Sequence, residues 1–276
     1  MIGRVLGMLL FIELGMFLLC AGVSAGYGES DYKYFLYTCI INAVVGGLLL
    51  LYGRGAENKM SRRDGYCVVT LSWVFFTFFG MLPFYFSGSI DTITNAFFET
   101  MSGFTTTGAT ILDDIESLSH GMLFWRSLTQ WIGGLGIVFF TIAILPIFTT
   151  GGVQLFSAES TGVTHDRTQP KINVMAKWLW TIYLVLTVSE TVLLMFGGMS
   201  LFDAICQSFA TTATGGYSTK QNSISYWNSP YIEYVVAIFM IVSSINFSLF
   251  LMCLKGKVGR LFKDEELHWF LASVGI

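Results

Sequence analysis

The chain has 276 residues, of which 54% are hydrophobic, 16% are aromatic and only 12% are charged. Soluble domains are about a quarter charged, so this composition excludes an ordinary soluble protein and indicates a membrane protein. The formal net charge of -3 gives no reason to expect a nucleic-acid partner.

Six apolar stretches are long enough to cross a membrane. A helical span needs roughly 20 predominantly apolar residues to cross a hydrocarbon layer of about 30 Å. The first stretch follows Arg4 and resembles a signal sequence, but its length and the embedded Glu13 argue against cleavage. The predicted spans are residues 5–26, 35–52, 66–87, 122–148, 174–199 and 231–254.

Basic residues favour one side of the membrane. If the six spans alternate in direction, twelve of the fifteen lysines and arginines share the side of the amino terminus, and Lys33, Arg126 and Lys220 do not. The positive-inside rule then predicts a multi-pass protein of the plasma (inner) membrane with a cytoplasmic amino terminus. The opposite side is acidic and should attract cations. Its acidic residues are Glu29, Asp31, Asp91, Asp113, Asp114 and Glu116.

Two connections on the acidic side, residues 90–121 and 200–230, are too apolar for ordinary loops, and they repeat each other. NAFFETMSGFTTTGATIL from Asn95 aligns without gaps with DAICQSFATTATGGYSTK from Asp203, at a constant shift of 108 residues. Each repeat predicts a helix too short to cross the membrane, followed by an extended T-x-G-x-[ST] stretch. We expect each connection to enter the membrane and return, with Asn95 and Asp203 capping the short helices.

Extended backbone at membrane depth must be buried in protein or line a water-filled path, because lipid cannot bond its amide and carbonyl groups. Glycine permits the dihedral angles that turn successive carbonyls inward, and threonine adds a hydroxyl oxygen. Rings of such oxygens replace the water shell of a cation, and the carboxyl ends of the short helices favour positive charge. The repeats therefore predict a cation filter, with re-entrant packing segments as the alternative.

These motifs together resemble the potassium-uptake superfamily of Trk, Ktr and plant HKT transporters, and most closely its Trk-type membrane subunit. The resemblance is carried by LPFYFSGS, NAFFETMSGFTTTGAT, QWIGGLGI, AILPIFTTGGVQLFSAE and SFATTATGGYST. It implies an all-α polytopic membrane protein in which two preliminary spans precede span, pore loop, span repeats around a potassium channel-like pore. Family members have four such repeats. This chain holds two and the start of a third, so we expect a fragment of a longer protein.

The resemblance also assigns a filter. It implies the pore glycines Gly108 and Gly216, and in plant relatives serine at the first pore glycine goes with sodium, so Gly108 favours potassium. The implied filter residues are Thr106, Thr107, Gly108, Ala109, Thr110, Thr214, Gly215, Gly216, Tyr217 and Ser218. The carbonyls expected to hold the potassium ion are those of Thr106, Thr107, Gly108, Thr214, Gly215 and Gly216.

The implied organisation has five parts. Two preliminary helices and a cytoplasmic loop occupy residues 1–64, the first repeat 65–150, a cytoplasmic connection 151–172, the second repeat 173–256, and a loop with the start of a third repeat 257–276. Potassium is the expected substrate, with no covalent cofactor. The expected partners are membrane lipid, a cytoplasmic nucleotide-binding regulatory subunit on the basic inner loops, and a second copy of the full-length protein.

Two residues near the predicted filter leave alternatives open. Glu99 in the first short helix either bonds behind the filter or lies near the outer aqueous surface. Arg126 opens the span after the first filter, where it would repel a cation. We expect Arg126 to pair with Asp113, Asp114 or Glu116.

Glu13 and Glu190 lie inside spans, where carboxylates suggest a function. They support a rival interpretation as a proton-coupled carrier or intramembrane enzyme, and a two-repeat subunit that dimerises is a rival assembly. Gly133, Gly134 and Gly136 predict close helix packing, with a kink near the pore as the alternative. Because the histidines are far apart and the serines lack a plausible base, we do not predict an enzyme.

Overall fold

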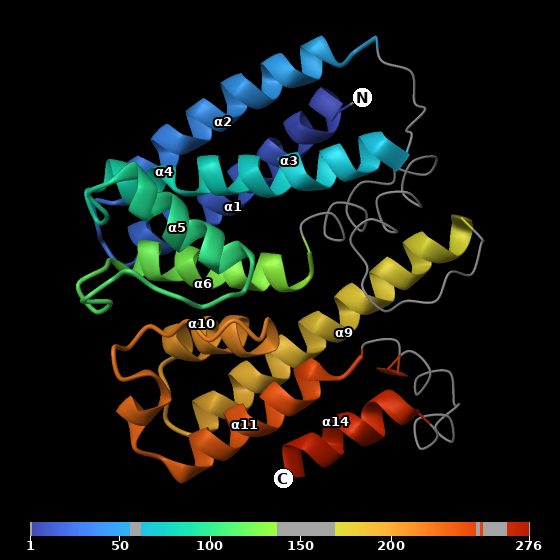
Figure 1. The fold of residues 1–276 in the computed structure, drawn as a ribbon. Coiled ribbons are helices and arrows are strands. Elements are labelled where there is room, and N and C mark those ends of the chain that lie inside the picture. Colours follow the sequence, from blue (N-terminus) through green and yellow to red (C-terminus); the bar gives the residue numbers. More distant parts are fainter. Residues whose placement is uncertain (1, 56–61, 137–168, 247–248, 251–263, 276) are drawn as a thin grey trace.

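The computed structural model describes residues 2–55, 62–136, 169–246, 249–250 and 264–275, and this part of the chain is helical without any β-strand (Figure 1). Four helices are long and apolar enough to cross a membrane, namely Ile2–Gly26, Tyr32–Tyr52, Asp64–Phe86 and Lys177–Phe196. The elements are α1 Ile2–Gly26, α2 Tyr32–Tyr52, α3 Arg62–Gly80, α4 Leu82–Phe86, α5 Ile93–Phe104, α6 His120–Gly134, α9 Gln169–Phe196, α10 Leu201–Thr212, the 3-10 turn η2 Ser223–Trp227, α11 Pro230–Ser244 and α14 Glu265–Gly275.

The remaining two predicted spans are not single continuous helices. α6 has 15 residues and ends at Gly134, and α11 has 15 residues and ends at Ser244. Each is only about 22 Å long at 1.5 Å per residue. Gly136, with a φ of 74°, follows the end of α6, as glycine often does at helix ends. Residues 137–148 and 251–254 of the predicted spans lie outside the described residues.

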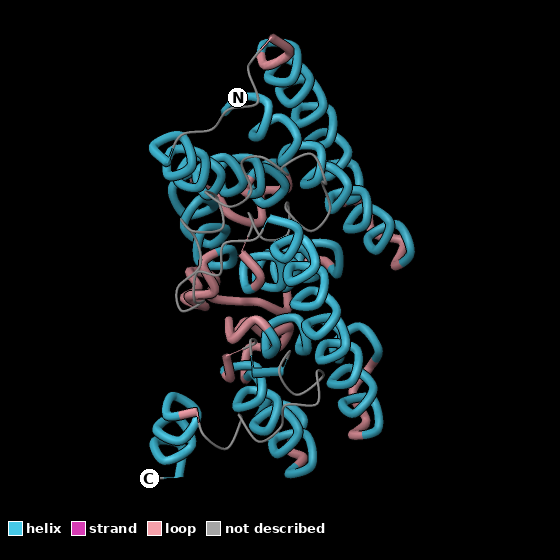
Figure 2. Tube along the Cα trace, turned by 90° about the vertical axis from the view of Figure 1, so that its right-hand side faces the viewer, coloured by secondary structure: helices cyan, strands magenta, loops and turns pink. Residues whose placement is uncertain are grey.

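The helices form two groups that meet along α6 and α10. Figure 1 shows α1 to α6 in one group and α9, α10, α11 and α14 in the other. α1 packs against α2, α3 and α6, whereas α10 packs against both α9 and α6. Seen from the side, loop segments gather in the middle of the molecule between the two groups (Figure 2).

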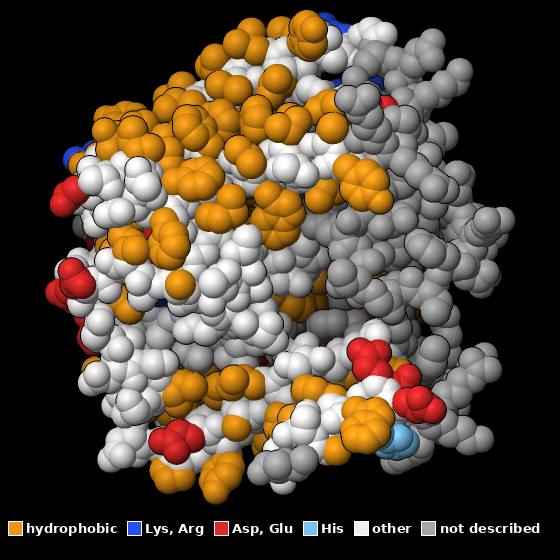
Figure 3. Space-filling view, in the orientation of Figure 1, with side chains coloured by type: hydrophobic (Ala, Val, Ile, Leu, Met, Phe, Trp, Pro, Cys, Tyr) orange, Lys and Arg blue, Asp and Glu red, His pale blue; other side chains and the backbone are white. Residues whose placement is uncertain are grey.

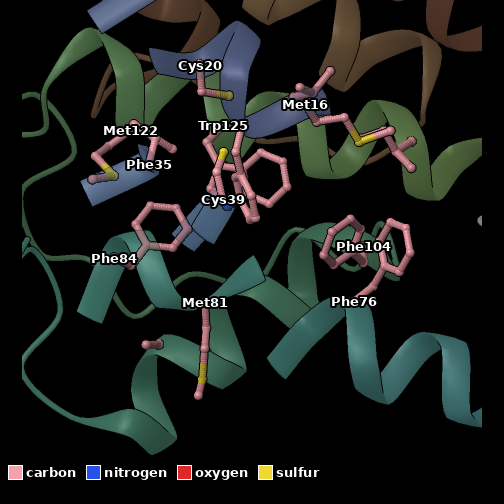
Figure 4. Packing of buried hydrophobic residues seen from close by; sticks show 14 of the residues in the cluster. Met16, Cys20, Phe35, Cys39, Phe76, Met81, Phe84, Phe104, Met122 and Trp125 are labelled. Atoms are coloured by element: carbon pink, nitrogen blue, oxygen red, sulfur yellow. The ribbon is translucent and has the colours of Figure 1, made fainter. Parts of the chain in front are cut away.

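Aromatic and sulfur side chains fasten the first two helices to the first repeat (Figure 4). The rings of Phe17 in α1 and Trp125 in α6 lie 4.6 Å apart between their centroids. The indole N–H of Trp125 donates to the carbonyl oxygen of Gly80 at 2.8 Å, so this fully buried side chain leaves no unbonded donor. Trp125 therefore attaches α6 to both α1 and α3.

The surface is apolar along the sides of the helices and charged at their ends. Figure 3 shows hydrophobic side chains covering the face formed by α2, α3 and α4, as expected for contact with lipid. Acidic side chains lie at one edge, where α1 ends and α2 and α6 begin, and a second acidic group lies on the opposite side, at the start of α14 (Figures 1 and 3).

Candidate functional site

The two short helices correspond residue for residue. α5 and α10 each have 12 residues, and their bounds differ by the same 108 residues as the sequence repeat. The hydroxyl of Thr92 accepts a hydrogen bond from the amide of Asn95, and the hydroxyl of Ser200 accepts one from that of Asp203. The expectation that Asn95 and Asp203 cap these helices is therefore wrong. The hydroxyl of an N-cap residue accepts a hydrogen bond from the backbone amide three positions later. Asn95 and Asp203 occupy that later position and donate this bond.

The chain leaves both helices in the same way, as segment 1 (residues 105–111) and segment 2 (residues 213–219), and neither is the continuously extended stretch that the sequence predicted. In segment 1 the amides of Thr106 and Thr107 donate back to Gly103 and Ser102 in α5. In segment 2 the corresponding amides of Thr214 and Gly215 donate back to α10. Both segments therefore turn their first amide groups toward the helix that they follow.

Each segment contains two residues with left-handed backbone. Thr106 and Gly108 have φ values of 53° and 74°, and Thr214 and Gly216 have φ values of 54° and 82°. Left-handed backbone is a rare and strained conformation for a β-branched residue such as threonine. The same strained pattern occurs twice at a shift of 108 residues, which indicates one built feature rather than two irregular loops.

The carbonyl groups of the segments fall into two sets. Within the described residues, the carbonyls of Ala109 and Ser218 accept hydrogen bonds: Ala109 from the Ser102 hydroxyl at 2.6 Å, and Ser218 from Arg126 at 3.0 Å. The other set accepts no hydrogen bond from any described residue. It includes the carbonyls of the predicted ion ligands at equivalent positions of the two segments, Thr106, Thr107, Gly108, Thr214, Gly215 and Gly216.

The two segments touch each other. A Cβ atom on Gly108 would overlap the carbonyl oxygen of Gly215, so the two backbones meet at these glycines. Gln130 of α6 is fully buried behind Gly215, and its Oε1 accepts a hydrogen bond from the amide of Tyr217 at 3.0 Å. Its Nε2 has no hydrogen-bond partner among the described residues. The first repeat thus supports the second segment.

A buried ion pair lies behind the segments. Glu99 of α5 and Arg126 of α6 form it at 2.8 Å, with side chains that are 0% and 2% exposed. The other bonds of Glu99 go to segment 1, from the Thr110 hydroxyl at 2.9 Å and the Ile111 amide at 3.0 Å. Of the two alternatives for Glu99, the one in which it bonds behind the segment is therefore confirmed.

The pairing expected for Arg126 is wrong. Glu116, in the loop before α6, bonds Lys220 at 3.3 Å, whereas Arg126 bonds the buried Glu99. The guanidinium of Arg126 also stacks on the ring of Tyr217, 3.6 Å from its centroid. Sequence reasoning placed Tyr217 in the filter but missed this contact. The available signal was the i, i+4 spacing of Arg126 and Gln130, which puts both on one face of α6.

Glycines in α6 bring that helix against the end of α5 and the start of segment 2. A Cβ atom on Gly133 would overlap the backbone of Phe104, the last residue of α5. A Cβ atom on Gly134 would lie 2.8 Å from Ala213 at the start of segment 2. Close packing is therefore the role of these two glycines, and the break in α6 follows them at Gly136.

A family model described as a cation transport protein, TrkH, matches residues 32–272. The chain belongs to this TrkH family. It is 40% identical over 273 residues to the Trk system potassium uptake protein TrkH of Escherichia coli K12, covering 98% of this chain and 56% of that relative. It is 33% identical over 252 residues to TrkG of the same organism, covering 90% of this chain and 52% of that relative.

A solved structure agrees with the family assignment. The crystal structure of the potassium transporter TrkH from Vibrio parahaemolyticus matches with a TM-score of 0.83 and 33% identity, covering 98% of this chain and 55% of that one. The expected resemblance and the all-α polytopic fold class are confirmed. This TrkH-family chain spans about half the length of the curated relatives that it matches.

Two further carboxylates of this TrkH-family chain are buried without a bond to either segment, although the partner of Glu190 directly precedes segment 2. Glu13 accepts a hydrogen bond from Asn42 at 3.0 Å, and Glu190 accepts one from Thr212 at 3.4 Å. The second oxygen of each has no hydrogen-bond partner among the described residues. The part of the chain that the structure describes holds no group of three or more His, Cys, Asp or Glu side chains placed to bind a metal.

Glu29 holds the amino-terminal end of α6. It lies in the turn between α1 and α2 and accepts hydrogen bonds from the amide and ring of His120 and from the amide of Gly121. Partial burial acts to raise the pKa of Glu29, but these bonds outweigh it and lower the pKa below its ordinary value. A carboxylate at a helix amino terminus is also favoured by the helix dipole.

Proposed function

We propose that the chain is the amino-terminal part of the membrane subunit of a potassium uptake system and supplies two of its filter segments. The observation that carries the proposal is the set of six carbonyls, three in each segment, that accept no hydrogen bond from the described residues. Of these six residues only Gly215 is buried, whereas Thr107, Thr214 and Gly216 are exposed, so this part of the segments is open to a ligand. A dehydrated cation is a partner that suits such oxygens.

The geometry supports a shared ion path. The contact between Gly108 and Gly215 brings the two segments to one place, and the left-handed residues recur at equivalent positions in both. The carboxyl ends of α5 and α10 lead directly into the segments, so their dipoles contribute negative potential beside the path. A cation would arrive from the acidic edge, lose water at the carbonyls and move down its electrochemical gradient.

Potassium is the proposed substrate because the relatives at 33% to 40% identity are named potassium uptake proteins. The filter residues proposed above remain the ion-binding set, with Ala109, Thr110, Tyr217 and Ser218 as supporting members whose bonds hold the segments. We propose the five-part division given above, an amino terminus in the cytoplasm, a dimer of the full-length protein, and a cytoplasmic nucleotide-binding subunit on the basic inner loops.

The test is cation uptake by the complete gene product in a bacterium that lacks potassium uptake. We expect wild type to restore growth at low potassium and to accumulate rubidium, and Gly108→Ser to abolish or retune this uptake. Unchanged uptake and unchanged ion preference in Gly108→Ser would refute the filter.

A proton-coupled carrier is the second candidate. It is favoured by the unbonded carboxylate oxygens of Glu13 and Glu190. Under the filter proposal, the double variant Glu13→Gln/Glu190→Gln keeps most of the uptake. Complete loss of uptake in a double variant that folds normally would favour the carrier instead.

A further inference from the structure

We propose that the buried Glu99–Arg126 pair fixes the position of segment 2 relative to segment 1 and thereby sets the cation selectivity of the filter. This inference rests on the proposed filter function. It assigns positioning roles to two residues that lie behind the carbonyls and are not expected to touch the ion.

Glu99 holds segment 1 through both of its oxygens. Oε1 accepts from the Thr110 hydroxyl and from Arg126, and Oε2 accepts from the amide of Ile111. The bonded groups of Thr110 and Ile111 follow the carbonyls of Thr106, Thr107 and Gly108 directly in the chain. Because the carboxylate is 0% exposed, water does not compete for its oxygens.

Arg126 carries the connection across to segment 2. Its Nε donates to Glu99 and its NH1 donates to the carbonyl of Ser218, so one rigid guanidinium bridges the two repeats. The ring of Tyr217 covers the guanidinium at 3.6 Å. The Tyr217 hydroxyl lies 2.8 Å from the carbonyl of Glu99 and 3.3 Å from that of Ala109, which closes the loop back to segment 1.

The second repeat has no corresponding pair among its described residues. The position equivalent to Glu99 is Gln207, whose Nε2 donates to Thr211 within the same helix. α11 begins and ends 110 residues after α6, so the position equivalent to Arg126 is Val236, an apolar residue that is 1% exposed. Segment 2 is therefore held by its own repeat through Asp203, which accepts from the Thr219 hydroxyl at 2.7 Å, and by the first repeat through Arg126.

This dependence has a consequence for selectivity. A carbonyl filter discriminates between cations through the number, spacing and field strength of its oxygens, so a shift of one segment changes the preference. Removing one partner of a buried pair leaves an uncompensated charge, which the surrounding groups move to accommodate. In Glu99→Gln, the unpaired guanidinium of Arg126 also adds positive potential beside the path.

The experiment measures potassium and sodium flux into liposomes that contain the purified complete gene product. The readout is the potassium-to-sodium permeability ratio, which does not depend on how many molecules fold. We expect Glu99→Gln and Arg126→Gln each to lower the ratio by about tenfold or more, equivalent to about 1.4 kcal/mol. A purely structural role would lower the yield and thermal stability but leave the ratio of the folded molecules unchanged.

Glu13→Gln is the matched control, because it neutralises another fully buried glutamate that bonds Asn42 and not the segments. It should keep the wild-type ratio. The inference is overturned if Glu99→Gln and Arg126→Gln keep that ratio, or if Glu13→Gln lowers it equally.

Tyr217→Phe tests the inference in the case that neither Glu99→Gln nor Arg126→Gln folds. It removes only the hydroxyl that joins segment 2 to Glu99 and Ala109. A lowered ratio in Tyr217→Phe supports the inference, and a wild-type ratio overturns it. If the wild-type protein carries no cation at all, the proposed function itself fails, which is a different result from flux with an unchanged ratio.

Discussion

The carbonyl oxygen of Gly215 occupies the space that a side chain on residue 108 would need. Gly108 and Gly215 belong to different repeats, so this contact joins segments that are far apart in the sequence. Glycine can be required in the segments for two reasons, a left-handed φ or a lack of space for a side chain. Gly108 combines a left-handed φ of 74° with this close approach. Gly216 has a φ of 82°, but a Cβ atom there would meet no described heavy atom within 4 Å beyond its chain neighbours.

Alanine substitutions exploit that difference. Left-handed backbone costs an alanine about 1 kcal/mol or more, and Gly108→Ala adds a clash with backbone. We therefore expect rubidium uptake to be lost in Gly108→Ala and only reduced in Gly216→Ala. The control is Gly88→Ala, at a φ of 70° with open space around it in an outer turn, which should retain uptake. Equal uptake in Gly108→Ala and Gly88→Ala would contradict the close contact.

Replacing a strained threonine by glycine is predicted to change the stability in the opposite direction. Thr214 has a φ of 54°, which glycine adopts without strain. We expect Thr214→Gly to leave the thermal stability in detergent unchanged or to raise it, because the strain is removed. The same variant should lower the potassium-to-sodium permeability ratio, since the segment loses stiffness. A fall in stability with an unchanged ratio would show that the threonine serves packing alone.

Close packing of α6 can be tested by stability. A Cβ atom in Gly133→Ala would overlap the backbone of Phe104, and overpacking of this kind costs about 1 to 3 kcal/mol. We expect its thermal denaturation midpoint in detergent to fall by about 5 °C or more. Gly15→Ala in α1 has nothing within 4 Å and should not lower the midpoint. Equal midpoints for the two variants would argue against close packing at Gly133.

The features that could be predicted from the sequence are those that depend on residues close to one another in the chain. The long spans follow from hydropathy, and the equivalence of α5 and α10 follows from a gap-free repeat. Even so, the N-cap residues differ from those expected, because Thr92 and Asn95 both offer a capping oxygen and only the helix boundary chooses between them. The position at which α6 ends could not be chosen from the sequence either, because the glycines of QWIGGLGI are compatible with both a closely packed helix and a helix break.

The partner of Arg126 could not be chosen from the sequence. Three acidic residues lie within about a dozen positions of it, and Glu99 lies much farther away along the chain. What decides the pairing is which face of α6 turns toward α5, and that depends on tertiary packing of Trp125 and Gly133. The contact of Tyr217 with Arg126 depends on the meeting of two repeats, which no local pattern specifies.

Acid should weaken the attachment of the first two helices to α6. Hydrogen bonds from His120 and Gly121 lower the pKa of Glu29 despite its partial burial. A carboxylate with a lowered pKa in the folded state contributes stability above its unfolded value, near 4.5, and loses it as the pH falls through the folded value. We expect Glu29→Gln to have a lower thermal denaturation midpoint than wild type at neutral pH. This difference should shrink below pH 4.5 as wild-type Glu29 becomes protonated.

The matched control is Glu233→Gln, which neutralises an exposed glutamate in the first turn of α11. It should follow the wild-type pH dependence of the midpoint, because Glu29 is intact in it. If Glu29→Gln shows the same loss of midpoint on acidification as wild type, the acid sensitivity arises elsewhere. Glu29 would then serve α6 as a hydrogen-bond acceptor whose charge is immaterial, a role that glutamine fills equally well.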